Sequence, residues 1–407
     1  MNDQAVSPHG IRLSDQQRLN WLRLIRSENI GPVTFRDLIL HCGSASNALE
    51  MLPELSRRGG SYRRIRLASL EQVTREMEAV EHLGARLIGM GEPDYPLYLK
   101  NCDAPPPLIT VQGDLSVFTK PPVGIVGSRN ASIAGARFTQ KIAAELGKAG
   151  FAIISGLARG IDAAAHQYSL KTGTVAVLAG GIDRPYPPQN IGLYHEIPEN
   201  GGAVVSEMPL GWEPRAQDFP RRNRIISALS SGLLVVEAAK RSGSLITARM
   251  AGEMGRVVFA VPGSPLDPRA SGTNELIKHG ALLVTEANDI IEALSPQLVR
   301  QSQQSTDKQF THQPDQLSLK IEEVEQDYQS HSLLNTTPHP EKMTPPASDK
   351  DREQIFNLLS PVPVSVDEII RHTGIEPAQV FLILLELDLA GQLSRYPNGH
   401  VALMPSM

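Results

Sequence analysis

The sequence holds few residues that would fix the chain covalently or place it in a membrane. Only two of its 407 residues are cysteines, Cys42 and Cys102, too few for the disulfide framework of a small secreted domain. No apolar run reaches the ~18 residues of a membrane-spanning helix. Residues 1–10 are polar and lack the apolar core of a signal peptide. We therefore expect a cytoplasmic protein without a membrane partner.

Common catalytic and metal-binding motifs are also missing. The sequence contains neither H-E-x-x-H nor G-x-S-x-G, and its cysteines and histidines form no cluster. The net charge is −5 at pH 7, and an acidic average by itself argues against a nucleic-acid binder. This average conceals local differences, which matter more. The 41% hydrophobic content is ordinary for a globular protein, and the length predicts two or three domains.

Residues 11–80 are predicted to form a helical domain. Apolar residues recur at helical spacing on both sides of an Ile30-Gly31-Pro32 turn. This order resembles a sterile-alpha-motif-like or helix-hairpin-helix module, and the latter can grip nucleic-acid backbone through turn N–H groups. Simple packing of the two helices is the favoured alternative. Five arginines near Gly59-Gly60 indicate a solvated basic loop: Arg57, Arg58, Arg63, Arg64 and Arg66.

Residues 83–294 are predicted to form an α/β domain. From residue 122 on, short β-branched runs alternate with amphipathic stretches such as 135–147 and 245–254. This alternation predicts a parallel, doubly wound, extended Rossmann-like sheet. Ligands of such sheets bind beyond the carboxyl ends of the strands. The expected strands are 124–126, 152–155, 175–178, 203–206, 233–237, 257–261 and 282–284.

The remaining chain divides into a linker and a small domain. Residues 295–350 are rich in Gln, Ser, Thr and Pro, which predicts a disordered linker. Residues 351–407 contain three helical stretches, a capping box opening at Ser365, and two strands around Pro397-Asn398-Gly399. Three helices followed by a hairpin predict a winged helix.

The strongest local signal is the buried strand that runs into Gly127-Ser128-Arg129 and then into a helix. A glycine turn at that junction presents backbone N–H groups to an anion, and the helix dipole adds attraction. The forked guanidinium of Arg129 suits phosphate. A nicotinamide or flavin site is disfavoured, because the glycines have the wrong spacing for G-x-G-x-x-G and no acid ends the second strand. We expect neither a cofactor nor a metal.

Three acidic or histidine side chains suggest an alternative, catalytic interpretation. Asp162 and His166 lie one helical turn apart and could form a proton relay or half of a metal site. An ordinary surface or cap pairing is the favoured interpretation. Glu237 ends a predicted strand and could act as a general acid or base. A structural role, as an acceptor for loop N–H groups or as a partner for an arginine, is favoured for it.

Positive charge is concentrated in residues 215–256, which contain eight Lys or Arg and only three Asp or Glu. Ser242-Gly243-Ser244 opens a helix there and offers a second nest of N–H groups. Two nests with several arginines suit a chain of phosphates better than a single nucleotide. Phe219 could stack a base or fill the core. Tyr186-Pro187 indicates a rigid turn, most simply a structural loop.

Four motifs in order resemble the DNA-processing protein DprA (Smf) family. They are Gly127-Ser128-Arg129, the stretch 155–162 (SGLARGID), the stretch 219–224 (FPRRNR) and the stretch 242–248 (SGSLITA). The resemblance implies a single-stranded DNA-binding protein that protects incoming DNA. It also implies a homodimer that loads the recombinase RecA during natural transformation, and no catalysis. The DNA-binding residues implied by the motifs are Ser128, Arg129, Gly156, Arg159, Phe219, Arg222, Asn223, Arg224, Lys240, Ser242, Gly243, Ser244 and Thr247.

The acidic composition of the C-terminal domain argues against DNA binding by its winged helix. A DNA-reading winged helix needs a basic recognition helix, whereas residues 351–407 contain seven acids and three bases. We therefore expect this domain to contact protein or the chain itself.

The rival function is a phosphoribohydrolase-like enzyme on a similar fold. Its Pro-Gly-Gly-x-Gly-Thr motif is matched by neither the stretch 179–183 nor the stretch 261–264.

Overall fold

The computed structural model describes residues 12–61, 63–306, 347–396 and 399–404. These residues form two compact units. Residues up to 75 combine with those from 347 on, and residues from 76 to 306 form the other unit. None of the described helices combines the length and apolar character needed to cross a bilayer.

The larger unit is built on one nine-stranded sheet in the order β1-β2-β6-β5-β4-β3-β7-β8-β9. The strands from β6 to β9 in this order are parallel, and β1 and β2 extend the sheet in antiparallel fashion. The strand bounds are β1 (Ala85–Gly89), β2 (Leu108–Gly113), β3 (Pro122–Val126), β4 (Ala152–Ser155), β5 (Thr174–Val177), β6 (Ala203–Ser206), β7 (Gly232–Val235), β8 (Val257–Ala260) and β9 (Leu282–Leu283).

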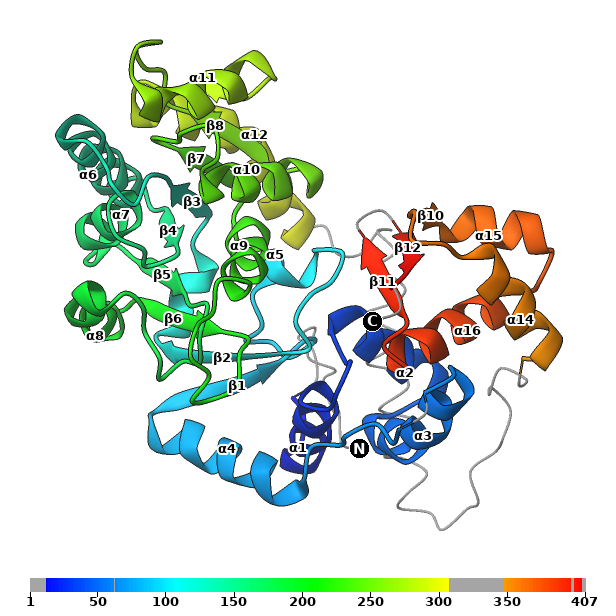
Figure 1. The fold of residues 1–407 in the computed structure, drawn as a ribbon. Coiled ribbons are helices and arrows are strands. Elements are labelled where there is room, and N and C mark those ends of the chain that lie inside the picture. The colour runs from blue at the N-terminus through cyan, green and yellow to red at the C-terminus, as the bar shows by residue number, and fades with distance from the viewer. Residues whose placement is uncertain (1–11, 62, 307–346, 397–398, 405–407) are drawn as a thin grey trace. The chain divides into compact units, whose positions relative to one another are not determined.

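Helices cover both faces of this sheet. Figure 1 shows α6 and α7 on one side and α9 and α10 on the other. The core under α6 contains the buried side chains of Ile125, Leu146, Phe259 and Leu294. The helices of the unit are α5 (Leu97–Lys100), α6 (Ile133–Lys148), α7 (Ile161–Ser169), α8 (Ile191–Glu199), α9 (Asp218–Leu229), α10 (Gly243–Glu253), α11 (Ser271–Lys278) and α12 (Ala287–Thr306).

The predicted α/β fold is confirmed, and all seven expected strands are present with small shifts at their ends. Their residues are fully buried from β3 to β7, as expected for parallel strands covered on both faces. Strands β1 and β2 were not among the expected strands. They pair through Leu87↔Thr110 in the middle of an antiparallel register.

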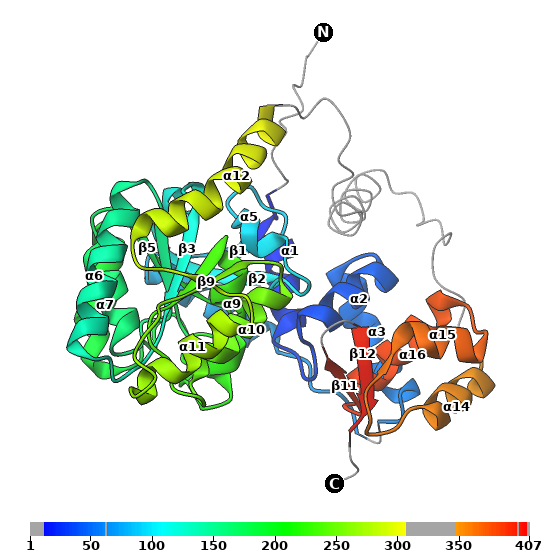
Figure 2. The same cartoon turned by 90° about the horizontal axis from the view of Figure 1, so that it is seen from above.

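The smaller unit combines the N-terminal helices with a winged helix (Figure 2). The capping box predicted at Ser365 is present, with the Ser365 hydroxyl accepting from Glu368 N. The three-stranded sheet has the order β10-β12-β11. The elements are α1 (Asp15–Ile25), α2 (Pro32–Cys42), α3 (Ala45–Arg58), α14 (Asp349–Leu358), β10 (Val364–Ser365), α15 (Val366–Thr373), α16 (Pro377–Leu389), β11 (Leu393–Tyr396) and β12 (His400–Leu403); α4 (Leu70–His82) leads into the larger unit.

The linker prediction needs a correction at its start. Helix α12 continues through Thr306, so residues 295–306 are helical instead of disordered. The helix is anchored by Ile290 and Leu294, which are fully buried, and Gln and Ser allow its continuation beyond them. Residues 307–346, and Pro397-Asn398 in the predicted turn, lie outside the described residues.

Candidate nucleic-acid interface

The sheet order places a ligand crevice between β3 and β7. From this pair, β4, β5 and β6 follow on one side, and β8 and β9 follow on the other. Ligands of doubly wound sheets bind where the strand order reverses, outside the carboxyl ends of the strands. Gly127-Ser128-Arg129 directly follows β3, and the loop of Lys240 follows β7. The two predicted phosphate nests therefore meet at the same edge of the sheet.

The first nest is a tight turn with free backbone donors. A Cβ atom on Gly127 would lie 2.7 Å from Ile161 Cγ1, so only glycine fits there. The Ser128 hydroxyl accepts from Asn130 N at 3.1 Å. Within the described parts of the chain, the backbone N–H groups of Ser128 and Arg129 donate to no protein acceptor. Free N–H groups beside a helix start suit an anion.

Glu237 holds the chain that follows the first nest in place through hydrogen bonds with Ser132. Its carboxylate accepts from Ser132 N at 3.0 Å and from the Ser132 hydroxyl, and Ser132 in turn caps α6 by accepting from Gly135 N. Gly135 is close-packed, because an added Cβ would lie 2.5 Å from the Glu237 carboxyl carbon. The structural role favoured for Glu237 is confirmed.

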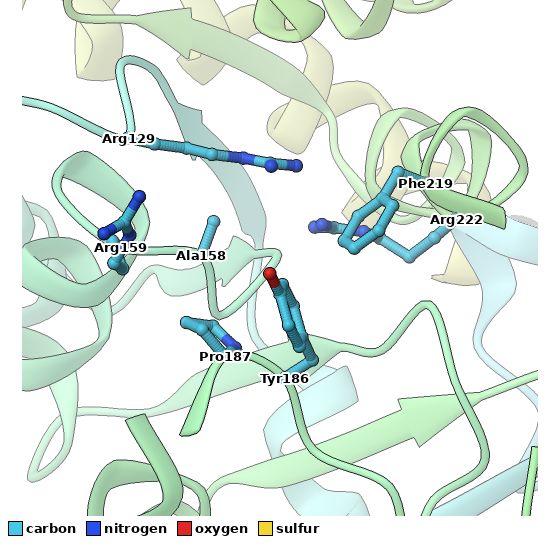
Figure 3. A pocket seen from close by; sticks show the side chains of 7 residues that line it. All are labelled: Arg129, Ala158, Arg159, Tyr186, Pro187, Phe219 and Arg222. Atoms are coloured by element: carbon cyan, nitrogen blue, oxygen red, sulfur yellow. The ribbon is translucent and has the colours of Figure 1, made fainter. Parts of the chain in front are cut away.

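A pocket of about 30 Å³ opens beside the first nest, and Figure 3 shows the side chains that surround it. The Arg129 guanidinium lies over the Phe219 ring, 4.9 Å from its centroid. The Tyr186 and Phe219 rings meet edge-on at 5.8 Å. The pocket thus combines three guanidinium groups with two aromatic rings. Its lining residues are Arg129, Ala158, Arg159, Tyr186, Pro187, Phe219 and Arg222.

Arg222 is the most unusual of these residues, because it is only 5% exposed. Its Nε is buried and has no hydrogen-bond partner among the described residues. Its Nη1 lies 4.0 Å from Asp162 Oδ2. Burial lowers the pKa of the Arg222 guanidinium to about 10, Asp162 partly offsets this, and Arg129 lowers the pKa further. A buried, incompletely paired cation is costly, and an anion in the pocket would relieve that cost.

Gly156 makes room for this arginine. A Cβ atom on Gly156 would lie 1.2 Å from Arg222 Nη1. Gly156 therefore contributes by having no side chain, because a side chain here would displace the Arg222 guanidinium. The family-derived assignment of Gly156 to the site is consistent with this position below the pocket.

The loop from Gly156 to Gly160 is held by buried polar side chains. Asp162 Oδ2 accepts from Gly156 N at 3.1 Å and from Ala158 N at 3.4 Å. His166 Nε2 accepts from Leu157 N at 3.3 Å, where Leu157 has a positive φ of 57°. Burial raises the pKa of Asp162 and lowers the pKa of His166 to about 3. The neutral imidazole is what this contact requires.

Of the surface or cap pairing favoured for Asp162 and His166, the surface position is wrong, because both side chains are buried. Asp162, in the first turn of α7, accepts instead from backbone N–H groups of the preceding loop. Each of the two side chains lies inside the protein, where it accepts hydrogen bonds from backbone N–H groups of the pocket loop. No cluster of three or more potential metal ligands occurs in the described part of the chain. Asn190 completes the loop by donating to Leu157 O at 2.8 Å and Ala158 O at 3.1 Å.

The second nest lies at the start of α10. Ser242 caps this helix, and its hydroxyl is 2.7 Å from the Ser244 hydroxyl. Asn223 Nδ2 donates to Gly243 O at 3.5 Å, which joins this nest to α9, the helix that carries Phe219 and Arg222. Lys240 is exposed in the preceding loop.

Two of the expected DNA-binding residues have structural contacts instead. Arg224 donates to Ala104 O at 2.9 Å and pairs with Glu207, so its guanidinium is engaged inside the protein. Thr247 is 1% exposed, and its hydroxyl donates back to Gly243 O. Thr247 faces the interior of the unit, and the partly buried Arg224 is held by these two contacts. We therefore withdraw them from the list of phosphate contacts.

Sequence reasoning missed three lining residues: Ala158, Tyr186 and Pro187. The Tyr186-Pro187 pair was noticed only as a rigid turn. Its signal was an aromatic residue in a glycine- and proline-rich loop between β5 and β6. That loop follows the carboxyl end of β5, where ligand contacts are expected.

Comparison with known proteins agrees with this geometry. The family model of DNA recombination-mediator protein A matches residues 86–295. The DprA-like N-terminal HHH domain matches residues 15–79, and the DprA winged helix domain matches residues 339–399. The chain belongs to the DprA (Smf) family. The predicted membership, the helical N-terminal domain and the C-terminal winged helix are thereby confirmed.

Individual members of the DprA family cover most of the chain. Protein Smf of Synechocystis sp. is 32% identical over 95% of this chain and 98% of its own length. The DNA processing protein DprA of Bacillus subtilis is 40% identical over 55% of this chain and 76% of its own. The solved structure of DprA from Streptococcus pneumoniae is similar with a TM-score of 0.53. It is 34% identical and covers 69% of this chain and 93% of that one.

Proposed function

We propose that the chain binds single-stranded DNA through phosphates seated in the pocket beside Gly127-Ser128-Arg129. The observation that carries the proposal is the buried Arg222, which lines the pocket together with Arg129 and is paired only loosely, at 4.0 Å, with Asp162. Three guanidinium groups line the pocket, which suits a phosphate group. Binding should depend on backbone charge more than on sequence.

The roles of the second nest and of partner proteins extend this proposal. Successive phosphates would reach the loop of Lys240 and Ser242, while Phe219 and Tyr186 offer ring surfaces to unpaired bases. We further propose that the chain works in the cytoplasm as a homodimer that protects incoming DNA and loads the recombinase RecA during transformation. These finer roles follow from family resemblance.

We infer that the protein is not an enzyme. The two carboxylates nearest the first nest are already engaged, Asp162 by backbone N–H groups and Glu237 by Ser132. Neither is available as the general base that a phosphoribohydrolase would need. Incubation with nucleoside monophosphates should release no free base. Released base would contradict this part of the proposal.

The central test is the variant Arg129→Ala, measured by filter binding of single-stranded and duplex DNA at several salt concentrations. Loss of one charge-assisted phosphate contact should weaken single-strand binding about tenfold or more. The slope of log affinity against log salt should become shallower by about 0.7. Arg249→Ala is the matched control, because Arg249 is exposed and paired with Glu253 on α10. Equal behaviour of the two variants would refute the role of Arg129.

A further inference from the structure

Helix α16 is buried on two opposite faces. One apolar stripe, Val380, Ile383, Leu384 and Leu387, belongs to the core of the winged helix. A second stripe, Leu382, Leu385 and Leu389, is no more than 3% exposed and lies outside that core. A helix with two apolar faces needs a packing partner on each of them. The rest of the winged helix covers only the first of these two stripes.

The second cover comes from the N-terminal helical domain. Leu389 O, at the end of α16, accepts from Asn29 Nδ2 at 3.1 Å and from the Ser56 hydroxyl at 3.5 Å. Gly59, which follows α3, touches the α16 backbone so closely that an added Cβ would lie 1.9 Å from Glu386 O. A methyl group at Gly59 would overlap the α16 backbone, so the chain after α3 packs closely against α16 at this point.

Charged groups cross the same interface. Asp388 Oδ2 accepts from the Thr34 hydroxyl at 2.8 Å, within the first turn of α2. Arg395 Nε lies 2.8 Å from Asp388 Oδ2, and its Nη2 lies 3.1 Å from Asp37 Oδ2. The arginine of the winged helix thus bridges one acid from each domain. Half-buried, interlinked ion pairs of this kind add specificity to a contact.

This contact covers parts of two elements that related modules use to bind nucleic acid. The third helix of a winged helix ordinarily enters the major groove, and here α16 is that helix. The Ile30-Gly31-Pro32 turn is the part of a helix-hairpin-helix that faces the nucleic-acid backbone. Asn29 and Thr34, on either side of this turn, are both bonded to the end of α16.

We propose that the second face of α16 is a protein-docking surface whose partner is the N-terminal helical domain of the same chain. The winged helix therefore serves as an intramolecular docking module and not as a DNA reader. The acidic surface of the domain and the absence of basic residues from α16 agree with this role. The inference does not depend on the proposed function of the central pocket.

The first test is the variant Gly59→Ala in the full chain, followed by hydrogen-exchange mass spectrometry. Gly59 has a φ of −71°, so alanine is strained there only by the contact with α16. We expect exchange of the α16 amides to accelerate about tenfold or more, with peptides of the central sheet unchanged. Gly252→Ala, on α10 of the central unit, adds the same methyl group in open space and should leave α16 protected. Unchanged α16 exchange in Gly59→Ala would overturn the proposal.

The second test is a double-mutant cycle on Asp37→Ala and Arg395→Ala in the full chain, read by the same α16 exchange rates. Coupled residues should give a combined acceleration smaller than the product of the single effects. Multiplicative effects would contradict the docking contact. Repeating the measurement over a hundredfold range of protein concentration distinguishes the partners. Protection that is independent of concentration supports docking within one chain, and protection that rises with concentration and mass would overturn it in favour of a second copy.

Discussion

At the residue scale, helix α9 places three arginines of one motif in three different environments. The sequence alone does not distinguish the roles of Arg221, Arg222 and Arg224 in the stretch 219–224. On α9 they separate, because Arg221 is exposed, Arg222 is buried under the pocket and Arg224 pairs with Glu207. Their orientations depend on the rotation of α9 against β3 and β4. Spacing alone does not determine that rotation.

Gly156 allows a test of the buried guanidinium without removing it. In Gly156→Ala the new methyl group would occupy the place of Arg222 Nη1, 1.2 Å away. The arginine side chain must move, and we expect single-strand affinity to fall about tenfold while the fold is retained. Fluorescence anisotropy with a labelled oligonucleotide measures the loss. Gly192→Ala on α8, where nothing lies within 4 Å, should bind normally; a similar loss in both would contradict the explanation.

At the scale of elements, the short apolar runs and the helical patterns between them predicted the strands and helices of the parallel sheet. They predicted them because strands buried on both faces are short, uniformly apolar runs separated by turn residues. The sequence prediction missed β1 and β2; in β1 the exposed Arg86 interrupts the apolar run. Strand β2 pairs with β6 and β1 pairs with β2, so both strands join the sheet through partners distant in sequence. Such long-range pairing leaves little local signal.

The start of α10 gives a prediction that separates two residues carried over from the family motif. Lys240 is exposed beside the second nest, whereas Thr247 is buried and bonded to Gly243 O. Lys240→Ala should weaken single-strand binding severalfold and reduce the salt slope by about 0.7. Thr247→Val should leave affinity within about twofold. A salt titration of both variants checks this, and the reverse order of effects would place the strand elsewhere.

At the scale of the whole molecule, net charge and domain order predicted less than local patterns did. The chain carries −5 overall, yet three arginines surround one pocket of the central unit. The domains follow one another along the sequence, but the first and last share a unit. That pairing is carried by Asn29, Thr34 and Asp388, more than 350 residues apart in sequence. No sequence period connects such residues, so the sequence predicted a contact with protein or with the chain itself but not the segment contacted.

The stability of the central unit should depend on pH through His166. This side chain is fully buried, donates to or accepts from Thr174 at 2.7 Å, and has a pKa lowered to about 3 by burial. In the unfolded chain a histidine binds a proton near pH 6.5. The unfolded state therefore holds more protons below that pH, and the free energy of unfolding should fall by about 1.4 kcal/mol per pH unit between pH 6 and 4. Above pH 7 this contribution is fully present.

The variant His166→Gln isolates that dependence. Glutamine can still accept from Leu157 N but does not titrate, so its unfolding free energy should start lower at pH 8 and then fall less steeply toward pH 4. The difference in slope should be about 1.4 kcal/mol per pH unit. Urea unfolding followed by hydrogen exchange in peptides covering β4 and β5 measures the central unit alone. His195→Gln, at an exposed position on α8, should keep the wild-type slope, and parallel slopes for all three proteins would show that His166 is not held neutral.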